Sequence, residues 1–189
     1  MIRRAGWLLA GLLAMAAPAG AQTLRGTGTP ANLPKLTVTS PDFAPGSPMP
    51  RAVAYPPCGG ADAAPEIRWS GAPAGTKSFV LTLFDPDAPT GVGFWHWVLM
   101  DIPPGAHAAG GAAGIPTGAI GGMTDHGKPG YQGPCPPAGD HPHHYRFTVR
   151  ALDIPAVPNA SADTTGAAAT FEMRGHILAE GTLVGTYAR

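Results

Sequence analysis

Residues 78–89 carry the sequence SFVLTLFDPDAP, in which an apolar run passes directly into an acidic, proline-rich turn. The run over residues 78–84 is almost continuously apolar and rich in β-formers, which is typical of a buried central strand. The prolines of the turn fix the backbone φ angle and remove N–H donors, so they hold the carboxylates in set directions. This stretch therefore predicts a β protein whose core strand delivers Asp85, with Asp87 close behind, to one edge.

Period-two alternation and short apolar runs predict further strands on both sides of this one. They cover residues 36–40, 66–69, 95–102, 143–152 and 183–187. The intervening residues from 103 to 142 show little regular pattern, and a loop of that length is more often functional than decorative. The composition, with 27 glycines, 23 prolines and 44% hydrophobic residues, also favours a loop-rich β fold.

One helix is predicted near the C-terminus, over residues 165–180, with Thr164 or Thr165 as its N-cap. No internal repeat is visible in the chain. The helix is expected to place these residues on one side: Ala168, Phe171, Gly175 and Leu178.

The first residues have the features of a targeting segment. Arg3 and Arg4 precede an apolar run over residues 6–17, and Ala19-Gly20-Ala21 forms a small-residue cleavage pattern. The run is shorter than the roughly 20 residues that span a bilayer. We therefore expect cleavage and export to the periplasm or the medium, without stable membrane insertion, and the alternative is an uncleaved anchor.

The chain thus divides into a signal peptide over residues 1–21, a flexible lead-in over residues 22–35 and one domain over residues 36–189. Its 12 basic and 12 acidic residues leave no net charge, which gives no electrostatic footprint for nucleic acid.

Cys58 and Cys135 are the two cysteines of the chain. An even number of cysteines in an exported protein predicts one disulfide. Two buried free thiols or a redox pair are the alternatives, although no Cys-x-x-Cys motif supports a redox pair.

Several acids and imidazoles follow the predicted strands closely. Asp85 follows directly after a hydrophobic strand. A carboxylate at that position can hold a nearby imidazole in one tautomer and raise the pKa of the imidazole. Asp87 has the alternative role of capping its own turn. His96 lies between two tryptophans of a core strand, where a buried neutral histidine bonded to the backbone is the alternative. His143 and Tyr145 share one strand face, and His144 points to the other.

Other local patterns carry weaker signals. Gly133 and Pro134 can leave a backbone N–H open toward a ligand, although such pairs are usually plain turns. His141, His143 and His144 suggest a metal, but the segment over residues 140–144 lacks an outer ligand pair at zinc spacing, so we expect no metal. Neither a nucleophilic serine motif nor a phosphate loop or dinucleotide fingerprint is present, and we expect no cofactor.

Two of these patterns together resemble the phosphatidylethanolamine-binding protein family, in its bacterial Raf-kinase-inhibitor-like branch. One is the strand that ends in Asp-Pro-Asp-x-Pro, followed by His96. The other is the Gly-x-Pro-Pro-x-Gly-type segment over residues 133–139, followed by His-x-Tyr at residues 143–145. The resemblance extends over residues 36–189.

The resemblance implies an antiparallel β-sandwich with Greek-key connections, long loops and one or two short peripheral helices near the C-terminus. It also implies homodimers in many members. One departure is His144, where the family usually has arginine, which leaves the usual pairing of that arginine open. The resemblance implies an anion pocket made of Asp85, Asp87, His96, Gly133, Pro134, His143 and Tyr145.

We therefore expect an exported protein that binds a small anion or a phospholipid head group through protonated His96 and His143, the Tyr145 hydroxyl and the Gly133 N–H. A protein-interaction or inhibitor module that acts through its surface, with an unknown protein partner, is the first alternative. The second is a weak hydrolase or lyase with His96 or His143 as its base. We expect no catalysis, because no activated nucleophile or metal can be named.

Overall fold

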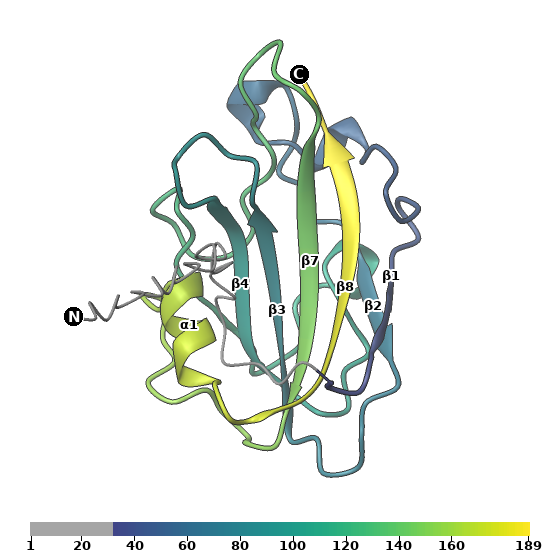
Figure 1. Ribbon diagram of the computed structural model, residues 1–189, viewed down its shortest axis with the longest axis vertical. Coiled ribbons are helices and arrows are strands. Elements are labelled where there is room, and N and C mark those ends of the chain that lie inside the picture. Colours follow the sequence, from purple (N-terminus) through teal and green to yellow (C-terminus); the bar gives the residue numbers. More distant parts are fainter. Residues whose placement is uncertain (1–31) are drawn as a thin grey trace, which may run out of the picture.

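The central strand of the structure is the one that the apolar run predicts. The computed structural model describes residues 32–189, and in it β3 (Ser78–Asp85) lies in the middle of a five-stranded antiparallel sheet. Figure 1 shows this sheet, whose order is β6-β4-β3-β7-β8. Its other strands are β4 (Phe94–Ile102), β6 (Ile120–Gly121), β7 (His143–Leu152) and β8 (Ile177–Tyr187).

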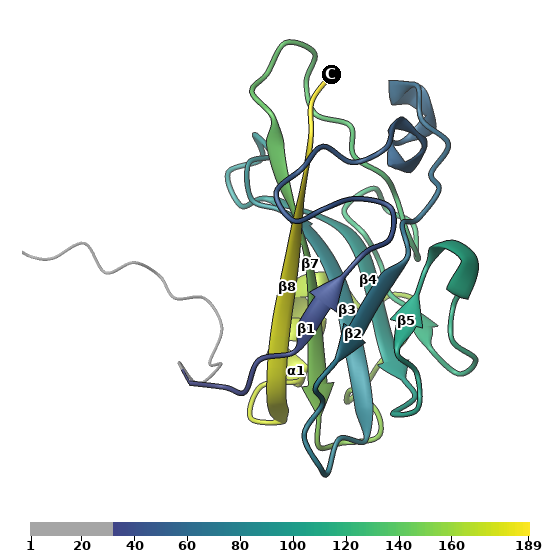
Figure 2. The same ribbon diagram turned by 90° about the vertical axis from the view of Figure 1, so that its right-hand side faces the viewer.

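A second antiparallel sheet packs against the first and makes the fold a two-layered sandwich (Figure 2). It has three strands, β1 (Thr37–Thr39), β2 (Ile67–Ser70) and β5 (Ala108–Ala109), in the order β1-β2-β5. The main hydrophobic core lies between the two sheets, with Trp69 on one side and Leu81 and Phe147 on the other. The predicted fold class is confirmed.

The segments between the long strands contain short 3-10 helices and short strands. Three 3-10 helices occur among the described residues: η1 (Arg51–Val53), η2 (Pro56–Cys58) and η3 (Gly111–Ala113). The segment between β4 and β7, expected to lack regular structure, contains β5, η3 and β6. Within it, β5 pairs with β2 at the edge of the three-stranded sheet, and β6 pairs with β4 at the edge of the five-stranded sheet.

The helix near the C-terminus is shorter than predicted. α1 spans Gly166–Glu172, and the Thr165 side chain caps it by accepting a hydrogen bond from Ala168 N. The predicted extension to residue 180 is wrong, because Gly175 adopts a φ of 86° and β8 begins at Ile177. Residues 177–182 instead pair along β7, where the strand satisfies their backbone groups more extensively than a free helix could.

The face that α1 buries also differs from the predicted one. Phe171 is 59% exposed, whereas Ala169 and Met173 are fully buried in a second core between the helix and the five-stranded sheet. Val80 and Val98 form the sheet side of this second core.

The predicted signal peptide, residues 1–21, lies outside the described residues, as does the lead-in up to residue 31. Residues 32–35 precede β1, and Glu180 N of β8 donates to Pro34 O at 3.1 Å. From residue 32 onward, no helix combines the length and apolar character that crossing a bilayer requires.

The predicted disulfide joins Cys58, at the end of η2, to Cys135, with the two Cα atoms 5.6 Å apart. It closes a long stretch, since the two residues are 77 positions apart in the sequence. The bridge therefore fastens the 51–62 region, which holds η1 and η2, to the segment that precedes β7.

Replacing both cysteines with serine should lower the free energy of unfolding by about 4 kcal/mol, because closing a loop of this size restricts the unfolded chain to that extent. Chemical denaturation of the mature protein measures the change. Thiol labelling of the denatured, unreduced wild type should detect no free cysteine, and prior reduction is the control. Full labelling without reduction would contradict the bridge.

Candidate functional site

The ends of β3 and β7 bring three predicted site residues together. In the register of these strands Phe84 lies opposite Arg146, so Asp85 comes next to Tyr145 and His143. All three side chains point to the inner face of the sheet and are almost completely buried. Asp85 and His143 are 58 residues apart in the sequence, and the pairing of their two strands brings them into one site.

A β-bulge in β4 adds His96 to this group. Leu83 pairs with Trp97 and Phe84 pairs with Trp95, so His96 is an extra residue on its strand. The bulge breaks the expected alternation, in which both tryptophans share one face opposite His96. Trp97 packs in the main core, while Trp95 points to the outer face of the sheet. His96 turns inward instead and lies beside Tyr145, with their ring centroids 5.4 Å apart.

These side chains line a cavity of about 320 Å³. Asp85, His96, His143 and Tyr145 form its polar wall together with His126. The remaining wall is mainly apolar and stiff, and its residues include Tyr55, Pro57, Ala88, Phe94, Pro136 and Pro137. The cavity is therefore a small chamber with a few convergent polar groups, which is the usual form of a ligand site.

His143 lies between two carboxylates. Its Nδ1 is 2.8 Å from Asp85 Oδ2 and its Nε2 is 3.2 Å from Asp140 Oδ2. Burial alone would lower the pKa of His143, but the hydrogen bonds to Asp85 and Asp140 outweigh it and raise the pKa. The imidazolium form is therefore favoured, and the buried Asp85 carboxylate gains a compensating charge.

Asp87 does not line the cavity. Its N–H donates to Asp85 Oδ1 at 2.9 Å, which closes the turn. Its carboxylate accepts from the His144 backbone N–H at 2.7 Å and lies 2.8 Å from His144 Nδ1. His144 stands where the family usually has arginine. It pairs with Asp87 of the turn, outside the cavity.

His96 is a neutral side chain with a defined tautomer. Its Nδ1 lies 3.0 Å from the Gln132 carbonyl oxygen, and only a protonated nitrogen can bond to that acceptor. Burial, with His126 nearby, lowers the pKa of His96 to about 4. Burial therefore disfavours the protonated form of His96, and in the neutral ring Nε2 carries a lone pair.

Two polar atoms at the cavity have no hydrogen-bond partner within residues 32–189. They are the Tyr145 hydroxyl, on a residue that is 0% exposed, and His126 Nε2. Burial and the neighbouring Asp85 carboxylate raise the pKa of Tyr145, so its O–H keeps its proton. An unpaired buried donor costs about 1–3 kcal/mol, which a bound ligand or water can recover.

Gly133 and Pro134 support the site from outside. The Gly133 N–H donates to Asp62 Oδ1 at 2.7 Å, so it is not the free donor that we expected. A Cβ at Gly133 would lie 2.0 Å from Val53 O, which explains the glycine by close backbone packing. Pro134 O accepts from Tyr55 N at 3.0 Å. These contacts position the 53–55 segment, which contributes Tyr55 to the cavity wall.

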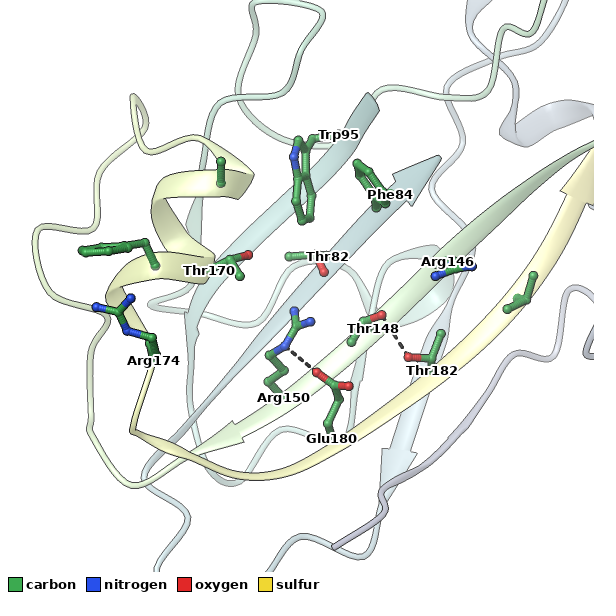
Figure 3. Close-up of a pocket in the computed structure, with 13 residues that line it drawn as sticks. Thr82, Phe84, Trp95, Arg146, Thr148, Arg150, Thr170, Arg174, Glu180 and Thr182 are labelled. Carbon is green, nitrogen blue, oxygen red and sulfur yellow. Dashed lines mark hydrogen bonds and ion pairs between the residues drawn. The ribbon is translucent and has the colours of Figure 1, made fainter. Parts of the chain in front are cut away.

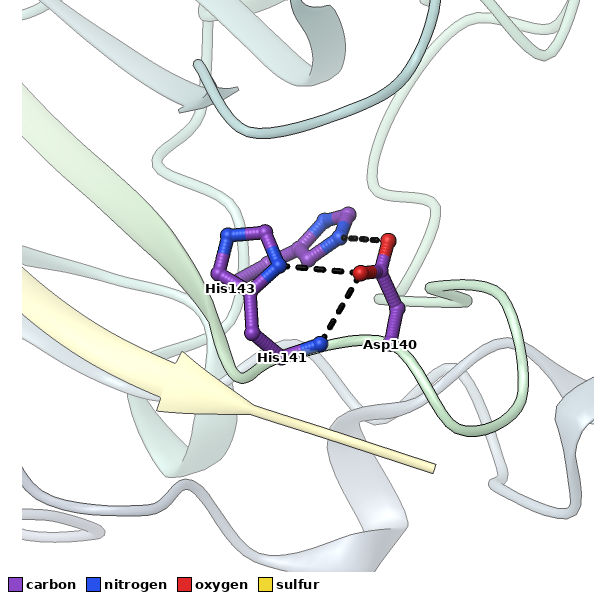
Figure 4. Close-up of side chains that lie close together, drawn as sticks. All are labelled: Asp140, His141 and His143. Carbon is purple, nitrogen blue, oxygen red and sulfur yellow. Dashed lines mark hydrogen bonds and ion pairs between the residues drawn. The ribbon is translucent and has the colours of Figure 1, made fainter.

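Asp140, His141 and His143 gather at the start of β7 (Figure 4). One ligand atom from each lies within 4.8 Å of the others, a spacing that could hold a metal ion. The pairs are already satisfied without one, because Asp140 Oδ1 is 2.9 Å from His141 Nδ1. The hydrogen bonds from His141 and His143 lower the pKa of Asp140 to about 2. The absence of bound metal stays a prediction, which metal analysis of the purified protein checks.

The structure therefore brings together Asp85, His96, His143 and Tyr145, and it places Asp87, Gly133 and Pro134 around them. Sequence reasoning missed His126, Tyr55 and Phe94, because they lie on loops or at a strand end without a recognisable motif. The only sequence signal for His126 was its place in a long loop, a type of segment that often carries function.

Comparison with known proteins places this geometry in a family. The sequence profile of the phosphatidylethanolamine-binding protein family matches residues 39–188. The chain belongs to this family. The membership predicted from the two motifs is thus confirmed, and the matched range includes all residues that line the cavity of this phosphatidylethanolamine-binding protein family member.

Bacterial relatives agree in sequence and in structure. UPF0098 protein YbcL of Escherichia coli is 40% identical over 136 residues, which cover 69% of this chain and 74% of YbcL. The crystal structure of YbcL gives a TM-score of 0.76 at 37% identity and covers 82% of this chain and 99% of that chain. A homolog from Chlamydia trachomatis, CT736, gives a TM-score of 0.72 at 32% identity over 82% and 98% of the two chains.

Asp85→Asn should lower the pKa of His143, because Nδ1 loses its charged partner, and should destabilise the fold by about 2 kcal/mol. Because the pKa of His143 is raised in the folded protein, the protonated ring adds to the free energy of unfolding below about pH 6.5. This contribution is lost as the pH rises through the raised pKa of the folded state. The stability difference from wild type should therefore narrow at alkaline pH. NMR titration of the ring resonances and denaturation at several pH values measure both effects.

Asp87→Asn is the matched control, because it removes a carboxylate from the same turn that pairs with His144 instead. It should leave the His143 pKa close to its wild-type value. An equal shift in the two variants would contradict the assigned pairing.

Proposed function

We propose that the cavity binds a small oxyanion of the kind that a phosphate or a phospholipid head group presents. The observation that carries this proposal is the Tyr145 hydroxyl, which is buried at the cavity wall and has no partner among the described residues. A phosphate or carboxylate oxygen within reach would accept its O–H and remove the cost of the unpaired group. His126 Nε2, the other unpaired atom, faces the same cavity.

The electrostatics of the cavity restrict which anions fit. The imidazolium of His143 lies between the Asp85 and Asp140 carboxylates, so the wall offers an anion directed donors rather than an excess of positive charge. His96 Nε2 is an acceptor while the ring is neutral. A ligand that also supplies a proton donor is therefore favoured, such as the O–H of a singly protonated phosphate or the ammonium of a zwitterionic head group.

The family supports this ligand class, since its name refers to phosphatidylethanolamine, whose head group carries both a phosphate and an ammonium. We further propose that binding takes place outside the cytoplasm. The Cys58–Cys135 disulfide fits an oxidising compartment. A similar Mycobacterium tuberculosis protein, LppC, is 38% identical over 161 residues and has lipoprotein in its name.

Titration with phosphate, acetate and phosphoethanolamine, followed by NMR, should shift the ring resonances of His96 and His126. Tyr145→Phe should weaken binding about five- to tenfold, since it removes one hydrogen bond of about 1 kcal/mol. Tyr187→Phe, a tyrosine outside the cavity lining, is the matched control. Unchanged histidine resonances at millimolar ligand would contradict the proposal.

The same titration should depend on pH if a bound anion draws a proton onto His96. Burial lowers the pKa of His96 to about 4, and a bound anion would raise this pKa, so affinity should increase as the pH falls from 7 and level off below 4. Calorimetry at several pH values with phosphoethanolamine measures this linkage. A flat profile would mean that His96 stays neutral and binds the ligand as an acceptor.

We expect no turnover of esters, phosphoesters or small lactones. The hydroxyl of Thr90, which lines the cavity, donates to Gly93 O at 2.6 Å and is therefore engaged with the backbone. His143 has both ring nitrogens engaged by carboxylates, which leaves neutral His96 as the one available base among the histidines predicted for this role. A substrate screen tests this, and turnover that both His96→Ala and His143→Ala abolish would contradict it.

A further inference from the structure

A second concave site lies on the outer face of the five-stranded sheet, beneath α1 (Figure 3). It is a groove of about 870 Å³. Side chains alternate along β7, so Tyr145 and Phe147 point to the inner core while Arg146, Thr148 and Arg150 point outward. The groove and the cavity therefore use opposite faces of the same strands.

Arg150 is the central feature of this groove. The residue is only 8% exposed, and its Nε lies 2.7 Å from Glu180 Oε2. Despite that short distance, the direction of the Nε–H does not satisfy a hydrogen bond. Within residues 32–189 neither Nε nor Nη1 of Arg150 has a hydrogen-bond partner. The ion pair with Glu180 compensates part of the cost of burying this guanidinium, and an anion in the groove would supply an acceptor for the remaining N–H groups.

The surrounding charges favour an anion. Arg146 from β7 and Arg174, which follows α1, line the groove together with Arg150, while Glu180 is the one acidic residue of the lining. Three guanidinium groups against one carboxylate leave an excess of two positive charges. Such an excess in a concave surface attracts anions over some distance.

The walls add hydroxyl and aromatic groups. Thr82, Thr148 and Thr182 lie opposite one another across β3, β7 and β8 and form a polar row beside Arg150. Phe84 and Trp95 pack at one end with their ring centroids 4.6 Å apart. The bulge at His96 is what turns Trp95 into this groove. The lining thus combines a cationic centre with an aromatic wall.

We propose that this groove is a second ligand site, which takes an organic anion with a flat apolar group attached to a carboxylate, sulfonate or phosphate. The anionic group occupies the space beside Arg150 and the threonine row, and the apolar group packs on Phe84 and Trp95. The site is independent of the cavity ligand, because the two sites share no lining residue.

The test uses naphthyl phosphate in calorimetry and anilinonaphthalene sulfonate in fluorescence, with Trp95 emission as a second signal. Wild type should bind both probes, and Arg150→Met should weaken both by about tenfold or more, since it removes hydrogen bonds to a charged group. Arg68→Met removes an arginine from β2 of the other sheet and should change neither affinity. Tyr145→Phe should leave groove binding unchanged, which separates this site from the proposed cavity function.

Arg150→Met leaves Glu180 without its ion-pair partner, so the double variant Arg150→Met/Glu180→Gln is measured in parallel and should lose binding equally. Thermal unfolding shows that both variants are folded. Equal probe affinity in wild type and the folded variants would overturn the proposal. So would a concentration-dependent dimer that excludes the probes from the wild-type groove, because the occupant would then be a second copy of the chain.

Discussion

The Asp85 carboxylate holds the site end of the sandwich together. Each of its oxygens has a separate task, since Oδ1 accepts from the Asp87 N–H and Oδ2 bonds to His143. The first contact sets the direction of the proline-rich turn, and the second joins the end of β3 to the start of β7. Because the turn is fixed, the Asp87 carboxylate reaches His144 on the far side of β7. One buried acid thus organises two strands and a loop, and the cavity wall depends on all three.

The bulge at His96 is the second constraint, and it gives the sheet two working faces. A regular β4 would place Trp95 and Trp97 on one side and His96 on the other. The extra residue sends Trp97 into the main core, His96 into the cavity and Trp95 to the outer groove. Bulges are frequent beside functional sites because they re-aim side chains in this way.

The strands were predictable because burial leaves two kinds of mark on the sequence: β3 is a nearly continuous apolar run, and the first half of β7 alternates with a period of two. Asp85, His143 and Tyr145 were predictable for the same reason, since strand ends and shared faces place them together. The helix limits were not, because residues 177–182 have a helical pattern yet gain a full ladder of hydrogen bonds on β7. The Gly133 N–H was misread because its partner, Asp62, is 71 residues away and belongs to an irregular segment. The bulge that turns both His96 and Trp97 inward was not predictable, because it leaves no mark on apolar alternation.

The two proposed sites would select ligands by different physics. In the cavity the His143 charge is compensated by the Asp85 and Asp140 carboxylates, so recognition would rest on the positions of Tyr145 and His126 and on the tautomer of His96. Geometry of that kind distinguishes one small head group from another, since a misplaced oxygen leaves a buried donor unpaired. In the groove the excess of positive charge attracts many anions, and the aromatic wall selects among them by shape. On these two proposals the inner site discriminates between similar head groups and the outer site takes a broader set of anions, and β3, β4 and β7 contribute residues to both.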